Sequence, residues 1–96
     1  MKRIGGKEAL AIHATGSATF VDVRTPNEIA QGKLAGATEA NVTSSSFSQQ
    51  ISNLDKSLPY IVYCRSGMRS ARACRIMEQN GFTDITNVSG GYRSMN

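Results

Sequence analysis

A short apolar run constrains the fold more than any other part of the sequence. The run Tyr60-Ile61-Val62-Tyr63 follows Pro59 without a polar interruption. Such a run is typical of a strand that is buried on both faces, as in a parallel sheet covered by helices. A loop rich in glycine, serine and arginine comes next, followed by a helical pattern. Strand, loop and helix in this order predict an α/β fold, in which sites form beyond the carboxyl ends of the strands.

The other segments repeat this alternation. The pattern predicts strands over residues 18–23, 40–42, 60–63 and 85–88 and helices over residues 7–14, 26–31, 47–54 and 70–80. In the first helix Leu10 and Ala14 share one apolar face. The second helix starts with a clear signal, since Thr25 and Glu28 have capping-box spacing and a proline stands between them. Short connections predict one domain over residues 1–96 with a mostly parallel sheet.

The composition excludes several classes of protein. The chain has 96 residues, 40% of them hydrophobic, which suits one small core. No apolar stretch approaches the roughly 20 residues that span a membrane, and the N-terminus has no secretory pattern. Two cysteines and one histidine are too few for a structural zinc site. We therefore expect a cytoplasmic protein with no bound metal and with reduced cysteines.

Positive charge is concentrated around one of the cysteines. The net charge is +4, yet residues 56–77 contain no Asp or Glu. That segment carries +5 and the rest of the chain −1, its cations being Lys56, Arg65, Arg69, Arg72 and Arg75. A focused positive field favours an anionic partner. Because aromatic residues do not alternate with these cations, a small anion at a helix start fits better than nucleic acid.

The loop after the apolar run has the composition of a thiolate site. Its residues are Cys64, Arg65, Ser66, Gly67, Met68, Arg69 and Ser70. A cysteine is nucleophilic only as the thiolate, so its pKa must be lowered by its surroundings. The following helix start, the two arginines, the serine hydroxyls and inward-turning N–H groups at the glycine would all favour a negative charge. We expect Arg69 to contact the anion more directly than Arg65, because it lies nearer the helix start.

Two reactions use such a loop: phosphoester hydrolysis through a cysteinyl-phosphate, and sulfur transfer through a persulfide. Cysteine-dependent phosphatases resemble one another in a C-x5-R loop. Here the spacing from Cys64 to Arg69 is C-x4-R, one residue shorter, and Ser70 takes the arginine position. A tighter ring suits a single sulfur atom better than a phosphate. No Asp or His next to the loop provides a general acid, although Asp22 could approach from another strand end.

The sequence resembles the single-domain rhodaneses, a family of sulfurtransferases, over nearly its whole length. Residues 20–28 (FVDVRTPNE) resemble the D-V-R-x-x-x-E segment of the family, and residues 32–37 (GKLAGA) its G-H-I-P-G-A loop. Residues 64–70 (CRSGMRS) are similar to the C-R-S-G-x-R-S active loop, and residues 81–91 (GFTDITNVSGG) to the closing pattern. Four motifs in the right order make the resemblance specific.

The resemblance implies a three-layer α/β/α domain with a central five-stranded parallel sheet. It also implies that Cys64 takes a sulfane sulfur from a small anionic donor, such as thiosulfate or a polysulfide, and passes it to cyanide or a thiol. The acceptor can be a protein, and then the chain is a sulfur-relay or binding module. The third function is a phosphatase or arsenate reductase of the same fold. No organic cofactor, nucleic acid or membrane partner is implied.

Several positions depart from the family pattern outside the loop. Lys33 replaces the usual histidine and Ala35 the usual proline, both in a structural loop. Ile29 replaces an aromatic residue, and Met95 stands where the family has tryptophan. Methionine fills a core gap less rigidly, so these changes bear on stability more than on chemistry.

Other polar residues have structural interpretations that compete with functional ones. By the resemblance, Asp22 and Arg24 form a buried ion pair that supports the loop. Cys74 is interpreted as a small core residue rather than a resolving thiol, because it lies more than two helical turns from Cys64. His13 is interpreted as an ordinary helix residue. For Cys64 itself the competing interpretation is a buried, unreactive cysteine.

Overall fold

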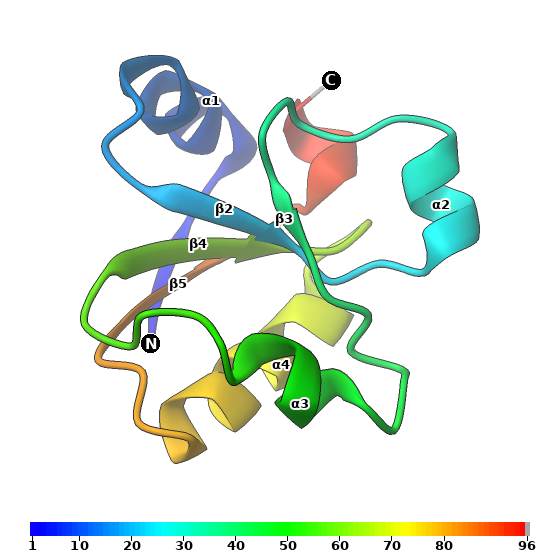
Figure 1. Ribbon diagram of the computed structural model, residues 1–96. Coiled ribbons are helices and arrows are strands. Elements are labelled where there is room, and N and C mark those ends of the chain that lie inside the picture. Colours follow the sequence, from blue (N-terminus) through cyan, green and yellow to red (C-terminus); the bar gives the residue numbers. More distant parts are fainter. Residues whose placement is uncertain (96) are drawn as a thin grey trace.

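The computed structural model describes residues 1–95, and its centre is one parallel sheet of five strands (Figure 1). The strands are β1 (Lys2–Ile4), β2 (Thr19–Asp22), β3 (Thr38–Glu39), β4 (Pro59–Tyr63) and β5 (Asp84–Val88). Their order in the sheet is β1-β5-β4-β2-β3, and every pair is parallel. The predicted five-stranded parallel sheet is confirmed, with β4 at its centre. Asn96, the last residue of the predicted domain, lies outside the described residues.

Helices cover both faces of the sheet. They are α1 (Gly6–Thr15), α2 (Pro26–Ala30), α3 (Phe47–Ile51), α4 (Met68–Gln79) and the 3-10 helix η1 (Tyr92–Met95). Figure 1 shows α1 and η1 on one side of the sheet and α3 and α4 on the other, while α2 lies beyond one end. This arrangement confirms the predicted three-layer α/β/α architecture. Within residues 1–95 no helix is long and apolar enough to span a bilayer.

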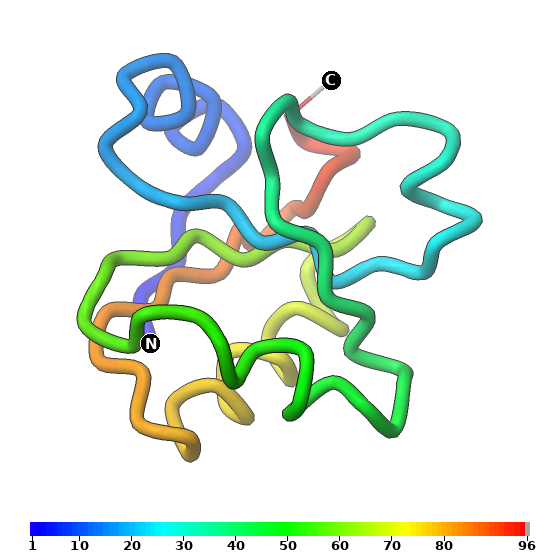
Figure 2. The backbone as a smooth tube through the Cα atoms, in the orientation of Figure 1, coloured from blue at the N-terminus to red at the C-terminus, as the bar shows by residue number. Residues whose placement is uncertain are grey.

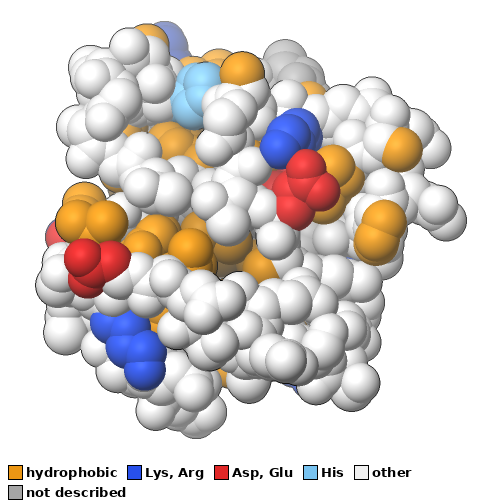
Figure 3. Space-filling model, viewed as in Figure 1, with side chains coloured by type: hydrophobic (Ala, Val, Ile, Leu, Met, Phe, Trp, Pro, Cys, Tyr) orange, Lys and Arg blue, Asp and Glu red, His pale blue; other side chains and the backbone are white. Residues whose placement is uncertain are grey.

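The unbroken apolar run of β4 divides its side chains between two cores. Tyr60 and Val62 pack with the α3 and α4 side chains, whereas Ile61 and Tyr63 pack with α1 and η1. All four are buried, because successive side chains of a strand point to opposite faces and both faces are covered here. In Figure 3 hydrophobic side chains are visible over β2 and β4, between the two helical layers.

Several local expectations were wrong at the edges of the fold. The buried face of α1 contains Gly6 and Ala9, while Leu10 and Ala14 are exposed. The strand predicted at residues 40–42 ends earlier, as β3. The sequence pattern also missed β1, whose chain lies beside the last strand (Figure 2). As an edge strand β1 is largely exposed and lacks an apolar signature.

The C-terminal segment, for which the sequence pattern predicted no helix, forms η1. Its Met95 is buried beside Ala9, so methionine does occupy a core position here. The capping box of α2 is confirmed, with Thr25 accepting a hydrogen bond from the backbone of Glu28 and its own N–H bonded to the Glu28 side chain. Helix α4 begins at Met68, two residues earlier than predicted.

Candidate active site

The site is built around Cys64, which directly follows β4 and is only 1% exposed. Its Sγ accepts a hydrogen bond of 3.1 Å from the backbone N–H of Gly67. Gly67 has a φ of 108° and is the N-cap residue of α4. This left-handed conformation turns its N–H towards the sulfur, and a side chain there would overlap the carbonyl oxygen of Ser89. Glycine is therefore required at this position by both its conformation and its close packing.

The surroundings of Cys64 favour a thiolate. Burial raises the pKa of the Cys64 thiol, but hydrogen bonds from the Ser70 hydroxyl and from the N–H groups of Ser70, Gly67 and Ser66 lower it. The net result is a pKa below the ordinary value of a cysteine. Backbone and hydroxyl dipoles at the start of α4 therefore stabilise the negative charge, as expected for a helix N-terminus. This result argues against the interpretation of Cys64 as an unreactive buried cysteine.

Asn87 in β5 holds the loop in place through two hydrogen bonds, and the sequence analysis did not identify it. Its Oδ1 accepts a hydrogen bond of 2.5 Å from the Ser70 hydroxyl, and its Nδ2 donates to the Gly67 carbonyl at 3.2 Å. The side chains of Asn87 and Ser70 are both buried. The available signal was a polar residue near the end of a largely buried strand. Because β5 lies next to β4 in the sheet, such a residue lies close to the loop that follows β4.

Arg69 is held by a carboxylate. Its guanidinium donates two hydrogen bonds to Glu28, of 2.7 and 2.8 Å, and this pair joins α4 to α2. Mainly because of Arg69, the pKa of Glu28 is lowered to about 2. Glu28 thus pairs with Arg69 in addition to forming the capping box with Thr25. Direct contact between Arg69 and a bound anion stays a prediction.

Asp22 and Arg24 form the expected buried ion pair. The Arg24 guanidinium donates to both carboxylate oxygens of Asp22, the shortest distance being 2.7 Å, and also to the Gly32 carbonyl at 2.7 Å. Its charged end lies 4.3 Å from the ring centroid of Tyr92 and 5.8 Å from that of Tyr63. The Asp22 carboxylate is fully buried, so it is committed to this pair and is a poor candidate for a general acid.

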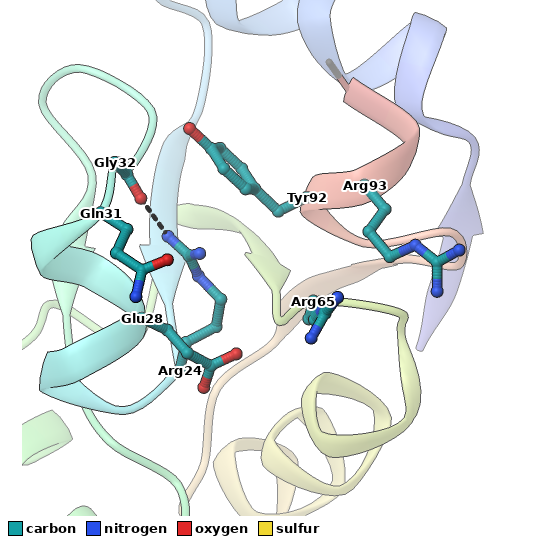
Figure 4. A pocket seen from close by; sticks show the side chains of 7 residues that line it. All are labelled: Arg24, Glu28, Gln31, Gly32, Arg65, Tyr92 and Arg93. Atoms are coloured by element: carbon teal, nitrogen blue, oxygen red, sulfur yellow. Dashed lines mark hydrogen bonds between the residues drawn. The ribbon is translucent and has the colours of Figure 1, made fainter.

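A pocket of about 310 Å³ lies between α2 and η1 (Figure 4). It is lined by Arg24, Glu28, Gln31, Gly32, Arg65, Tyr92 and Arg93. In Figure 4 Arg65 and Arg93 lie on one side of it, while Glu28 of α2 and the two residues that follow this helix, Gln31 and Gly32, lie on the other. The backbone connects this pocket to the loop, because the N–H of Tyr92 donates to the Cys64 carbonyl at 2.8 Å. Neither Tyr92 nor Arg93 was predicted, since η1 was not.

The remaining candidates fall into two groups. In the loop, Ser66 and Met68 are exposed, and Met68 is 82% exposed. Away from the loop, Cys74 is fully buried, and burial raises the pKa of its thiol to about 12, which fits a core residue. The His13 ring bonds to the carbonyl of Ala35 at 2.8 Å and packs edge-on against Phe20, as expected for a structural residue.

Comparisons with known proteins agree with the fold and with the motifs. The protein-family model described as rhodanese-like domain matches residues 6–96 of this chain. An uncharacterised protein of Bacillus subtilis, YqhL, is 36% identical over 76 residues, which are 79% of this chain and 59% of that protein. The thiosulfate sulfurtransferase GlpE of Pseudomonas entomophila is 35% identical over 91 residues, covering 95% of this chain and 81% of that enzyme.

Solved structures show the same architecture. The crystal structure of a rhodanese-like domain protein from Staphylococcus aureus superimposes with a TM-score of 0.89 and 29% identity, over 100% of this chain and 92% of that one. With the family match over residues 6–96, this chain belongs to the rhodanese-like family. It spans about three-fifths of YqhL and about four-fifths of GlpE.

Proposed function

We propose that this chain is a sulfurtransferase that carries a sulfane sulfur as a persulfide on Cys64. The observation that supports it best is a buried sulfur that accepts a hydrogen bond from the Gly67 N–H and whose pKa is lowered by the neighbouring backbone and Ser70 groups. A persulfide places one more sulfur, with a negative charge, at the same point. The relatives named as sulfurtransferases, GlpE among them, support this type of reaction.

The proposed reaction has two steps, and in both of them a nucleophile attacks the sulfur atom that is transferred. With thiosulfate as donor, the Cys64 thiolate attacks the outer sulfur, a new S–S bond forms, and sulfite leaves with the electron pair of the broken S–S bond. An acceptor thiolate, or cyanide, then attacks the terminal sulfur of the persulfide. The bond to Cys64 breaks, and Cys64 leaves as the thiolate. The charge stays balanced in both steps, so no cofactor is needed.

Each part of the site has a role in this proposal. The loop of Arg65, Ser66, Gly67, Met68, Arg69 and Ser70 surrounds the persulfide. Arg65 and Arg93, both exposed at the pocket, attract the anionic donor and the leaving sulfite. Asp22 and Arg24 support the loop through the buried ion pair. We place this reaction in the cytoplasm, where both cysteines stay reduced.

A phosphatase or arsenate reductase is less well supported. Such chemistry needs an arginine free to grip a tetrahedral anion, and the guanidinium of Arg69 is bonded through two nitrogens to Glu28. It also needs a general acid, and the Asp22 carboxylate is buried under Arg24. The alternative of a sulfur relay shares the persulfide and differs only in its acceptor.

Mass spectrometry of the intact protein after incubation with thiosulfate tests the proposal. We expect one added sulfur atom in the wild type and in Cys74→Ser, and none in Cys64→Ser. Cys74→Ser is a matched control, because it removes the other thiol. Retention of thiosulfate:cyanide transfer by Cys64→Ser would disprove the mechanism.

The same preparation distinguishes the alternatives. Hydrolysis of an aryl phosphate with no sulfur added to Cys64 would favour the phosphatase. Stable sulfur loading with weak transfer to every small acceptor would favour the relay.

A further inference from the structure

A second hollow borders the Cys64 loop on the side that faces β1 and α4. Its volume is about 370 Å³, and its lining includes Ser66, Gly67 and Met68 of the loop, Arg75 of α4, Arg3 of β1, and Ser89. None of the residues lining it is aromatic or acidic. The loop that surrounds the sulfur is thus also one wall of this groove. We call it the Arg3–Arg75 groove.

The register of the sheet explains why Arg3 lies there. Arg3 is paired with Asn87, the residue that holds Ser70 and Gly67 in place. The next residue, Ile4, packs into the core on the α1 side. Since successive side chains of a strand alternate between faces, Arg3 points to the other face, where Arg75 extends from α4. The two guanidinium groups therefore face one hollow from two different elements.

These two positive charges have no internal counterion in the part of the chain that the structure describes. Neither Arg3 nor Arg75 belongs to any of the ion pairs formed within residues 1–95. Glu78 follows Arg75 by three residues, but its carboxylate bonds to the Met1 ammonium at 3.1 Å and does not line the groove. Two like charges around a hollow repel each other, and an anionic ligand relieves that repulsion.

The groove also presents an apolar contact. Met68 is 82% exposed, the highest value among the exposed large hydrophobic side chains. A methionine side chain adapts to many partner surfaces. One exposed apolar side chain that lines the same groove as two arginines suits an acidic partner that also carries an apolar residue, rather than a bare inorganic anion.

The geometry of the sulfur limits how an acceptor can reach it. Cys64 is 1% exposed, and an attacking thiol must come within about 3.5 Å of the sulfur that it takes. A protein thiol therefore has to be presented on a narrow segment that is held beside the loop. A second copy of this chain is disfavoured as the partner, because both copies would carry +4. Single-stranded nucleic acid is disfavoured because no aromatic ring among the described residues lines the groove for base stacking.

We propose that the Arg3–Arg75 groove docks an acidic segment of a protein that presents the acceptor thiol to Cys64. The proposal rests on the proposed function, since it names the class of acceptor for the persulfide. In the transfer step the acceptor thiolate attacks the terminal sulfur of the persulfide, and the Cys64 thiolate leaves. The groove adds no chemistry to this step; it increases the time that the thiol spends near the sulfur.

The test compares two synthetic peptides as acceptors in a single turnover from the preformed Cys64 persulfide. One peptide has a single cysteine flanked by Asp, Glu and one leucine, and the other has Asn and Gln in place of the acids. Acidic neighbours raise the pKa of the peptide cysteine, so rates are compared per thiolate. At low ionic strength we expect the acidic peptide to react about tenfold faster, an advantage that falls as salt is added.

Charge-reversal variants separate docking from the overall charge. The groove variant is Arg3→Glu with Arg75→Glu, and the control is Lys7→Glu with Lys56→Glu, which changes the net charge equally at exposed positions outside the groove. We expect the groove variant to transfer sulfur to the acidic and the neutral peptide at similar rates. The control should keep most of the faster transfer to the acidic peptide. Both should transfer sulfur to uncharged 2-mercaptoethanol at the wild-type rate.

Several results would overturn this proposal without touching the proposed function. Equal losses in both double variants would mean that only net charge matters. A cysteine-free acidic peptide that competes no better than a single-stranded oligonucleotide of equal charge would mean that the groove binds any polyanion. Equal rates for the two peptides in the wild type would mean that no docking occurs. Failure of Cys64 to accept sulfur at all would refute the proposed function instead.

Discussion

Replacing Ser70 by alanine should make the Cys64 thiolate much less abundant. Among the groups that lower the pKa of Cys64, the Ser70 hydroxyl has the largest effect. Because a hydroxyl has one proton, it donates either to Asn87, as in this structure, or to the sulfur. Ionisation of Cys64 favours the second arrangement. Loss of a hydrogen bond to a charged group costs at least about 1.5 kcal/mol, which corresponds to roughly a tenfold smaller thiolate population wherever the thiol dominates.

The pH dependence of alkylation by iodoacetamide measures this population. We expect Ser70→Ala to react about tenfold more slowly than wild type at mildly acidic pH and at nearly the same rate at high pH, where both are thiolates. Peptide mass mapping confines the signal to Cys64, and Cys74 stays protonated because burial raises the pKa of its thiol to about 12. Ser66→Ala is the control, since Ser66 acts on Cys64 through its backbone N–H.

The same substitution has a separate cost in stability. Ser70→Ala leaves the buried Oδ1 of Asn87 without its donor, and an unsatisfied buried acceptor costs about 1–3 kcal/mol. Urea unfolding should show a loss in this range, while Ser66→Ala should be close to wild type because that side chain is exposed. A wild-type pH profile in a folded Ser70→Ala protein would refute the argument that the hydroxyl stabilises the thiolate.

Three further predictions concern the same loop. Arg69→Ala should raise the pKa of Cys64 less than Ser70→Ala does, because Glu28 already neutralises the Arg69 charge; a thiol titration with no rise would exclude Arg69 from the site. The pKa of Glu28 is lowered from 4.5 to about 2 in the folded chain, so its stabilising pair with Arg69 is present above pH 4.5 and is lost as the pH falls towards about 2. Urea midpoints measured across that range should therefore fall more steeply in wild type than in Glu28→Gln, and parallel curves would contradict the pairing. Gly67→Ala should abolish sulfur loading while the far-UV circular dichroism persists, since a side chain at a φ of 108° strains the loop and overlaps Ser89; normal loading would contradict the close packing.

Elements with strong local signals were predictable from the sequence. The apolar run at residues 60–63 indicated a doubly buried strand, and Thr25 with Glu28 indicated a capped helix; both are confirmed. These signals work because hydrogen bonding and burial at those places depend on residues close in the sequence. The edge strand β1 gave no such signal, because two of its three residues are both charged and exposed. Its partner strand β5 also lies near the other end of the chain.

The position of Cys64 after a buried strand and before an arginine-containing helix start was apparent from the sequence, and so was the family resemblance. The expected contributions of the Gly67 N–H and the serine hydroxyls to the thiolate site agree with the structure, where Gly67 and Ser70 lower the pKa of Cys64. The expected contributions of the two arginines are less direct, since Arg65 is exposed and Arg69 is bonded to Glu28, 41 residues away. Charges are easy to count in a sequence, whereas their partners depend on how distant segments pack.

Between residues 18 and 88 the alternation of strands and helices, the cysteine loop and the positive charge around it all followed from local sequence, because each depends on residues that are neighbours along the chain. Packing of distant segments placed Asn87 against the loop, paired Arg69 with Glu28, and left Arg3 and Arg75 facing one groove with no ion-pair partner among residues 1–95. The physical reason is that parallel strands place the ends of distant segments at one edge of the sheet. Hydrogen bonds and ion pairs across that edge join residues that no local pattern connects.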